Sequence, residues 1–366
     1  MVIAAFFALQ VTLVALWSLN STPRTRTSIP EAVLGVVEGI ALAGLSYTEH
    51  IKTDRPSPLL STYLLLTIIL DIALARTFII RDGLFAISAV FTAAMALKLV
   101  LLILEEVPKR RFLITEQEVV RETSVGVVSR TLFLWLNPLL WRGTRSVLTV
   151  DSLGPLHQKL KPKPLLDQLE TTWNNDAKEG GMALLRVTVK SYKAQLLAGV
   201  IPRLLLSAFT FAQPFLIESV INTVAQPPEE HRGKTISGLI GATVLLYVGM
   251  AVAAMWYRHM TFQLVTMYRG GLAGLVFKKT LRLDGDKTGE AAPVTLMSTD
   301  VEGVAEALNS IHDLWSAFLE LPVGIYLLYR QVGIPSLFVL VPAICESSCV
   351  DRSTPKTQLT NSVQRL

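Results

Sequence analysis

The stretch TISGLIGATVLLYVGMAVAAMWY, residues 235–257, contains no charged side chain. About 20 consecutive apolar residues form a helix long enough to cross the hydrocarbon core of a bilayer. The whole chain has the same character: 51% of its residues are hydrophobic, 17% are charged, and its mean hydropathy is +0.46. Soluble domains carry about 25% charged residues. The sequence therefore predicts an integral membrane protein that crosses the bilayer as α-helices.

Other apolar runs on both sides of this stretch have a length or composition that suits a span. With the central run placed at 236–258, we expect eight spans in an all-α polytopic protein; the other seven are 1–19, 32–47, 59–80, 84–104, 196–224, 314–329 and 331–345. Gly333-Ile334-Pro335 separates the last two runs and is typical of a tight turn between helices.

The charged residues lie mostly between these runs. Lys109, Arg110 and Arg111 follow the fourth run, and such basic clusters favour the cytosolic side. We therefore expect the connector 105–190 and Met1 to be cytosolic. The formal charge of +5 is spread between apolar runs and not gathered on one soluble face, which argues against a nucleic-acid partner. The lipid bilayer is the partner that the composition implies.

Residues 129–143, SRTLFLWLNPLLWRG, form an aromatic and apolar segment inside the connector. The segment is too short to span, and Pro138 is expected to interrupt it. We interpret it as a helix in the membrane interface, with Trp135 and Trp141 at the level of the lipid headgroups. The alternative is a buried helix in a small soluble subdomain.

The polar region 258–313 contains long sections without helix breakers. Residues 258–283 and 293–313 are expected to continue neighbouring spans into the cytosol, with a turn at 284–290 between them. At about 1.5 Å per residue, a 25-residue extension projects roughly 35–40 Å from the bilayer. Helices of that length are typical of contacts with another domain.

Several of these segments, in this order, resemble ABC transporter subfamily C, the multidrug-resistance-associated exporters. Residues 129–143 with 148–153 resemble the lasso and elbow segment, and 277–281 the end of a long transmembrane helix. Residues 289–300 followed by Trp315-Ser316-Ala317 are similar to the first intracellular loop and the next span. Pro58–Ser61 and Arg76-Thr77 resemble the fungal branch in particular.

The resemblance implies a division into four regions. Residues 1–104 correspond to four spans of a five-helix accessory domain, 105–190 to the linker with the lasso and elbow, and 191–345 to the first four helices of an ABC type-1 exporter domain. The polar tail 346–366 departs from the family, so we expect a truncated chain that is inactive alone. A short but complete family member is the alternative.

ATP-driven exporters bind nucleotide through a loop of the pattern G-x-x-x-x-G-K-[ST]. The sequence lacks it: the nearest stretch is Gly233-Lys234-Thr235, and Pro228 stands where the first glycine belongs. We expect the chain by itself to have no catalytic residue, no metal site and no ATP site. ATP and Mg are implied for full-length relatives, whose nucleotide-binding domain is missing from this chain. The two cysteines, Cys345 and Cys349, are interpreted as incidental thiols.

Polar residues inside spans are costly and are candidate functional residues. Arg203 matches a position at which the family's organic-anion exporters carry a basic residue that meets substrate; snorkelling to the interface is the alternative. Gln213 and Glu320 precede Pro214 and Leu321-Pro322, so they either line the cavity or compensate for the prolines. Trp256 and Trp315 either stack on a flat substrate or anchor the helices at the interface. Asp71 and Lys98, in adjacent spans, are expected to pair.

Two further sites are predicted between the spans. The turn residues Asp284, Gly285, Asp286, Lys287 and Thr288 resemble the segment through which the family couples to its ATP-binding domain. Asn20-Ser21-Thr22 is an N-glycosylation sequon, but it lies too close to the membrane for efficient use.

The predicted function is the transmembrane part of an ATP-driven exporter of amphipathic organic anions or xenobiotics, in the plasma or the vacuolar membrane. A regulatory membrane scaffold that holds a channel or a full transporter is one alternative. A proton-coupled carrier that uses Glu38, Asp71, Glu218 and Glu320 is another, although its inverted repeats are not visible in the sequence.

Overall fold

The computed structural model describes residues 1–19, 25–52, 56–81, 83–107, 122, 125–176, 183–225, 232–282 and 296–335. Within these ranges every regular element is a helix. Internal contacts divide the chain into two compact units, Met1–Pro155 and Leu156–Leu366. Each unit is described by itself below.

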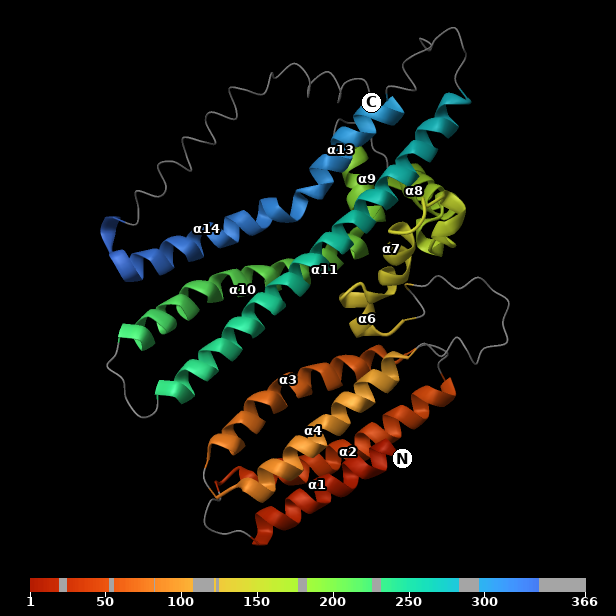
Figure 1. The fold of residues 1–366 in the computed structure, drawn as a ribbon. Coiled ribbons are helices and arrows are strands. Elements are labelled where there is room, and N and C mark those ends of the chain that lie inside the picture. The colour runs from red at the N-terminus through yellow and green to blue at the C-terminus, as the bar shows by residue number, and fades with distance from the viewer. Residues whose placement is uncertain are drawn as a thin grey trace. The chain divides into compact units, whose positions relative to one another are not determined.

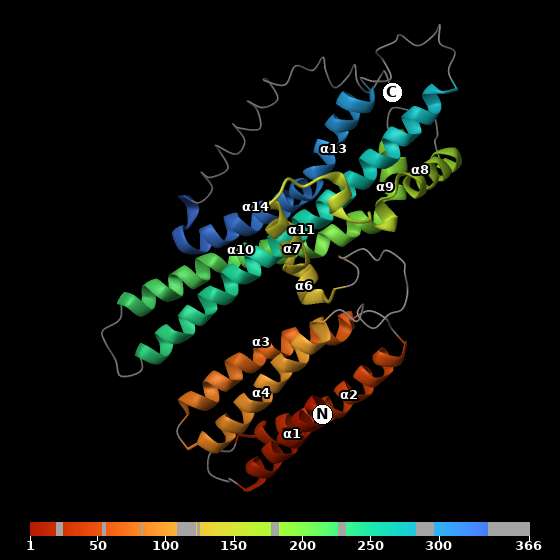
Figure 2. The ribbon, with the colours of Figure 1, turned by 45° about the vertical axis from the view of Figure 1, so that its right-hand side comes forward.

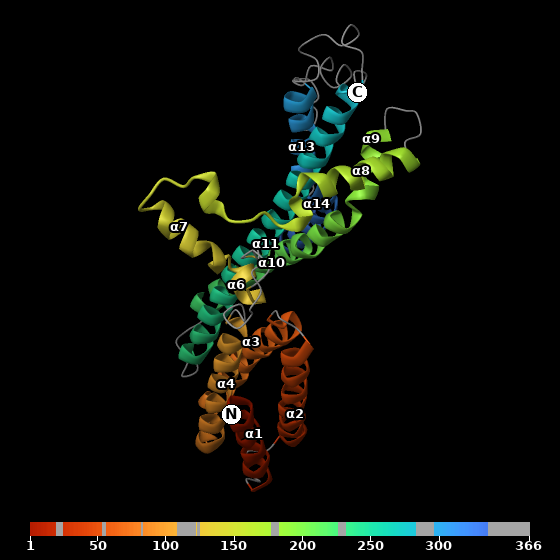
Figure 3. The same ribbon diagram turned by 90° about the vertical axis from the view of Figure 1, so that its right-hand side faces the viewer.

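The first unit contains four long helices, which lie side by side in Figures 1 and 3: α1 (Val2–Leu19), α2 (Ser28–Lys52), α3 (Pro58–Ile80) and α4 (Phe85–Glu106). Helix α1 packs against α2 and α4, and α3 packs against α4. Two clusters of buried side chains, around Phe6 and Leu64 and around Trp17 and Ile87, fill the space between them. The outward faces expose leucine, isoleucine and phenylalanine, as a surface against lipid requires.

The start of α3 is fixed by its capping residue and by a hydrogen bond to the end of α4. Ser57 is the N-cap, and its Oγ accepts a hydrogen bond from the Leu60 backbone N–H at 3.2 Å. Pro58 occupies the first turn, where its missing N–H costs no hydrogen bond. The Ser57 N–H donates to Glu105 Oε1 at 2.9 Å, which joins the start of α3 to the end of α4.

The aromatic segment 129–143 is broken, but not where the sequence predicted. Helix α6 (Val127–Thr131) ends before Phe133, which adopts a left-handed φ of 56°. A short 3-10 turn (Leu134–Leu136) leads into α7 (Asn137–Gly143), and Pro138 lies in the first turn of α7. The prediction that Pro138 interrupts the helix is therefore wrong: proline is tolerated in a first turn, and Phe133 makes the break. The interfacial position of this segment stays a prediction.

The first helical elements of the second unit are a 3-10 turn (Gln158–Leu160) and two helices, α8 (Pro162–Asp176) and α9 (Ala183–Ser191). They lead into two long helices, α10 (Lys193–Ala225) and α11 (Arg232–Thr280), which lie side by side in Figures 1 and 2. Helix α10 contains Pro202 and Pro214, as spanning helices often do.

Helix α11, with 49 residues, is the longest of the described elements. At about 1.5 Å per residue it measures roughly 70 Å, more than twice the hydrocarbon core of a bilayer. This confirms the predicted helical extension beyond residue 258. Its second half forms the core of the unit with α8 and α9, through the fully buried side chains of Leu169, Val187, Tyr192 and Tyr268. Lys278 Nζ on α11 lies 2.6 Å from Glu170 Oε2 on α8.

The last described elements of the unit are a π-helical turn (Leu296–Asp300), α13 (Val301–Asn309) and α14 (Ile311–Val332). Among the residues that the structure describes, seven helices are long and apolar enough to cross a membrane: α1 to α4, α10, α11 and the stretch that contains α14. They match seven of the eight predicted spans and confirm an all-α, multi-pass membrane protein. The eighth, 331–345, falls mostly outside the described residues; α14 ends at Val332, and Gly333 has a positive φ of 79°.

Candidate functional site

Arg203 lies on α10 and turns its guanidinium toward α14. Its Nη2 is 3.1 Å from Glu320 Oε1, and its Nε is 3.4 Å from Asp313 Oδ1. The Arg203 side chain is only 14% exposed, whereas Asp313 and Glu320 are 46% and 31% exposed. Arg203 therefore does not snorkel along its own helix: it bridges two carboxylates of a neighbouring helix.

Two serines extend this network, one next to Arg203 and one next to Glu320. Arg203 Nε donates to Ser316 Oγ at 2.9 Å, and the Ser316 hydroxyl donates to the Asp313 carbonyl at 3.0 Å. Ser207, one turn along α10 from Arg203, donates a short hydrogen bond to Glu320 Oε1. The two helices are thus joined by charge-assisted hydrogen bonds, which are stronger than those between neutral groups.

Helix α11 joins the same cluster through Tyr257. The Tyr257 hydroxyl donates to Asp313 Oδ1 at 3.1 Å, and the Arg203 guanidinium lies 5.7 Å from the centre of the Tyr257 ring. The latter distance is within the range of a cation–π interaction. We call Arg203, Ser207, Tyr257, Asp313, Ser316 and Glu320 the arginine cluster; it ties together α10, α11 and α14.

His312 lies beside the arginine cluster and is 3% exposed. Its ring meets the Tyr257 ring edge-on, with the centroids 6.1 Å apart, and Trp315 Nε1 donates to His312 Nδ1 at 3.0 Å. A Cβ at Gly199 would stand 2.6 Å from His312 Nε2, so the glycine on α10 makes room for the imidazole. Trp315 is therefore held by a hydrogen bond within its own helix.

The charges of the cluster decide what it can bind. Arg203 contributes +1 and the two carboxylates together −2, so the cluster carries −1. Glu320 and Asp313 engage Nη2 and Nε of Arg203, so an anionic group that binds these atoms would have to displace a carboxylate. Because those carboxylates are held partly by Arg203, such an exchange would loosen α14 from α10.

Of the five predicted cavity residues, the structure brings three together. Arg203 and Glu320 are paired directly, and Trp315 joins them through His312. Gln213 lies ten residues further along α10, about 15 Å away along the helix axis, and within the described residues it forms no hydrogen bond that compensates for Pro214. Trp256 is half-buried and precedes Tyr257, so it projects about 100° around α11 from the cluster.

Sequence reasoning missed His312, Asp313, Tyr257 and the two serines. A signal for part of this set was present: Asp313, Ser316 and Glu320 recur at i, i+3 and i+7, which is one stripe of a helix. Tyr257 carries no such signal, because its partner is on a different helix.

The acidic residues of the carrier alternative are divided between the two units. In the first unit, Lys98 Nζ lies 2.7 Å from Asp71 Oδ2 and 2.8 Å from Glu38 Oε1, so the predicted Asp71–Lys98 pair is confirmed. Glu320 is part of the arginine cluster in the second unit, and Glu218 is exposed on α10.

The remaining predicted sites fall elsewhere. The coupling residues 284–288 and the sequon at Asn20 lie outside the described residues. Gly233-Lys234-Thr235 forms part of the first turn of the continuous helix α11, not a loop that encloses phosphates, so these residues do not fit ATP. Among the described residues there is no group of three His, Cys, Asp or Glu side chains placed to hold a metal ion.

The sequence of the chain is similar to part of several fungal proteins named ABC transporters. The chain is 36% identical over 339 residues to the ABC multidrug transporter B of Aspergillus fumigatus. The aligned region covers 91% of this chain and 23% of that protein. It is 37% identical to the ABC multidrug transporter lscH of Purpureocillium lilacinum, over 90% of this chain and 22% of the relative. The ABC transporter atnG of Emericella nidulans is 34% identical over 94% of this chain and 22% of its own length.

No protein-family model matches the chain. The chain spans less than a quarter of the length of the curated relatives that it matches. The chain contains the apolar helices described above, and its sequence lacks the phosphate-binding loop of an ATPase. These relationships, together with the seven apolar helices, support the assignment of the chain to the ABC transporter family.

Proposed function

We propose that this chain is the transmembrane part of an ATP-driven subfamily C exporter that moves amphipathic organic anions or xenobiotics across the plasma or the vacuolar membrane. The observation that carries the proposal is the arginine cluster inside a chain whose relatives are named multidrug transporters. A buried arginine is the side chain best suited to bind a carboxylate, sulfate or phosphate group in two places at once.

In this proposal the substrate's anionic group competes with Glu320 for Arg203. Trp315, Trp256 and Gln213 line other parts of the pathway and contact the apolar body of the substrate. Once Arg203 is engaged by substrate, Glu320 keeps only its contact with Ser207, and α14 is free to move relative to α10. A ligand shifts such an equilibrium only by the difference in its affinity for the two arrangements, and competition for Arg203 supplies that difference.

The proposed exporter binds ATP and Mg in a nucleotide-binding domain that is not part of this chain. Residues 284–288 would contact that domain, and the long helix α11 would carry its movement to the cluster. In this proposal the chain alone does not pump, because its sequence lacks the G-x-x-x-x-G-K-[ST] loop that binds ATP.

A chimaera tests the proposal: this chain replaces the matching segment of the Aspergillus fumigatus transporter, and ATP-dependent uptake of a fluorescent glutathione conjugate is measured in inside-out vesicles. We expect uptake by the chimaera, a loss of about tenfold for Arg203→Ala from the lost charge-assisted contact, and a smaller loss for Arg203→Lys. Glu218→Gln, at an exposed carboxylate of the same helix, is the control.

Equal uptake by the chimaera and its Arg203→Ala form would overturn the role of Arg203. A chimaera that folds and binds ATP but takes up no conjugate would overturn transport of organic anions. If the unmodified chain then co-purifies with an intact transporter, the scaffold alternative replaces the exporter.

A further inference from the structure

The four helices of the first unit each place one polar side chain near their middle. Gln10 on α1, Glu38 on α2, Asp71 on α3 and Lys98 on α4 all lie within three residues of the centre of their helix. A spanning helix has its centre near the middle of the bilayer, where polar groups are most costly. Four such residues at one depth are not explained by interfacial snorkelling.

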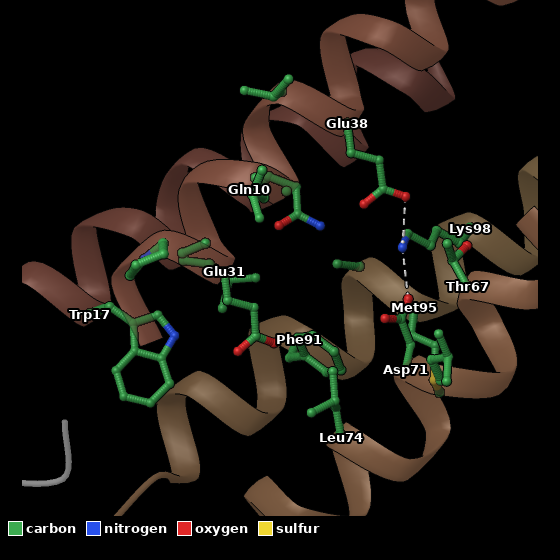
Figure 4. A pocket seen from close by; sticks show the side chains of 18 of the residues that line it. Gln10, Trp17, Glu31, Glu38, Thr67, Asp71, Leu74, Phe91, Met95 and Lys98 are labelled. Carbon is green, nitrogen blue, oxygen red and sulfur yellow. Dashed lines mark hydrogen bonds and ion pairs between the residues drawn. The ribbon is translucent and has the colours of Figure 1, made fainter. Parts of the chain in front are cut away.

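These residues line a cavity of about 870 Å³ between the helices, a size that holds a drug-sized molecule. Figure 4 shows Gln10, Glu31 and Glu38 from one side and Asp71 and Lys98 from the other. The remaining wall is largely apolar and includes Leu13, Leu70 and Leu74 and the aromatic rings of Trp17, Phe78 and Phe91. The cavity thus combines a long apolar wall with one polar side.

Gln10 contributes a buried amide to the wall of this cavity. It is 6% exposed, it points into the cavity in Figure 4, and among the described residues it has no hydrogen-bond partner. Its amide oxygen lies against Gly35, where a Cβ would collide with it. A buried amide without a partner is costly, so a ligand that hydrogen-bonds to Gln10 gains stability at that point.

The cavity also has an excess of negative charge. Lys98 lies between Asp71, at 2.7 Å, and Glu38, at 2.8 Å, and Glu31 adds a third carboxylate. Three carboxylates against one ammonium leave a formal charge of −2. Glu38 Oε1, although close to Lys98, has no hydrogen bond of good geometry. An intramembrane carboxylate in this position favours a second cation.

We propose that this cavity is a binding site for lipophilic amines in their protonated form. The ammonium group would donate hydrogen bonds to Glu38 and to the Gln10 amide oxygen. The apolar body of the amine would lie against the aromatic wall formed by Trp17, Phe78 and Phe91. The site is built only from helices α1 to α4, so it goes beyond the exporter function proposed for the arginine cluster and does not depend on it.

The test measures saturable binding of tritiated imipramine, a tricyclic tertiary amine, to the purified full chain in detergent. Competition by iminodibenzyl, which has the same ring system without the amine, isolates the contribution of charge. We expect iminodibenzyl to bind about tenfold more weakly, as the loss of a charge-assisted hydrogen bond implies. Equal affinity of the two compounds would overturn the proposed recognition of a cation.

Variants separate the site from general hydrophobic binding. Glu38→Gln is expected to weaken imipramine binding about tenfold and Gln10→Leu severalfold, while Lys98 keeps Asp71 as its partner in both. Met95→Trp fills the cavity without changing its charge and should abolish binding. Glu218→Gln, at an exposed position of the second unit, should leave imipramine binding unchanged.

Unchanged binding in both Glu38→Gln and Met95→Trp would overturn the site. Because the thermal unfolding of each variant is recorded in parallel, a loss of fold is distinguished from a loss of binding. The exporter proposal is tested separately, since its measurement uses an anionic conjugate and residues of the second unit.

Discussion

Arg203 Nη2 and Glu320 Oε1 lie 3.1 Å apart, although they belong to the different helices α10 and α14. Both residues were candidates on sequence grounds, for different reasons, and the tertiary structure makes them one unit. Several measurable consequences follow from this pair and from the other buried polar contacts.

Glu320→Gln should destabilise the second unit by about 1–2 kcal/mol, because it removes a partly buried ion pair while Asp313 still faces Arg203. In a double-mutant cycle with Arg203→Gln, the coupling between the two sites should be about 1 kcal/mol or more. Thermal or denaturant unfolding in detergent measures both quantities. Glu218→Gln on α10 is the matched control, and a coupling of zero would mean that the pair contributes nothing to the packing of α10 on α14.

Gly199→Ala should destabilise the chain by about 1–3 kcal/mol, since the added Cβ would stand 2.6 Å from His312 Nε2 and the His312 side chain is buried. Shortening the partner with His312→Ser should recover part of this loss in the double variant. Gly324→Ala, where a Cβ meets no atom within 4 Å, is the control and should be neutral or slightly stabilising. The same unfolding measurement compares the three variants, and equal effects of the two glycine substitutions would contradict the close approach of His312.

Lys98→Met should destabilise the first unit by about 3–5 kcal/mol, because the Lys98 side chain is 5% exposed and the loss of its ammonium leaves two carboxylates without their cation. The triple variant Lys98→Met, Glu38→Gln and Asp71→Asn should regain most of the loss, since it removes the uncompensated charges. Amide hydrogen exchange of α3 and α4 reports the effect on this unit directly. If the triple variant is less stable than Lys98→Met, the carboxylates are not the source of the cost.

Tyr192 makes the stability of the second unit depend on pH in the alkaline range. This residue lies between α9 and α10, is fully buried, and donates to the Met267 carbonyl at 3.2 Å. Burial raises its pKa from 10.0 to about 12. The unfolded chain therefore releases this proton first, so the stability that Tyr192 contributes is fully present below pH 10.0 and is lost as the pH rises toward about 12.

Tyr192→Phe should cost about 1 kcal/mol at neutral pH through the lost hydrogen bond. It should also make the decline of stability between pH 10 and 12 shallower than in the unmodified chain. Urea unfolding at a series of pH values checks both effects, with Tyr247→Phe, at a 51% exposed position, as the control. An identical pH profile for Tyr192→Phe and the unmodified chain would show that the phenol ionises equally in both states.

The candidate site was only partly accessible from the sequence. The Asp71–Lys98 pair was predictable, because both residues lie in adjacent spans and each needs an opposite charge. Glu38 joins them from α2, and no spacing in the sequence relates α2 to the other two helices. In the same way, Asp313 and Tyr257 complete the contacts of Arg203 from two helices whose rotation depends on packing. The break at Phe133 also escaped prediction, because a left-handed phenylalanine has no signature in composition.

The sequence by itself determined which of the described segments are long and apolar enough to cross a membrane, and that the chain resembles the transmembrane part of an ABC exporter. Hydropathy and length decide a span locally, since each helix satisfies its own backbone hydrogen bonds in lipid. Only the tertiary structure decided which polar residues come together. Arg203 pairs with Glu320, and Gln10 and Lys98 line the same cavity. Those contacts depend on how each helix is rotated and how closely it approaches its neighbours, and small residues such as Gly199 and Gly35 set that distance.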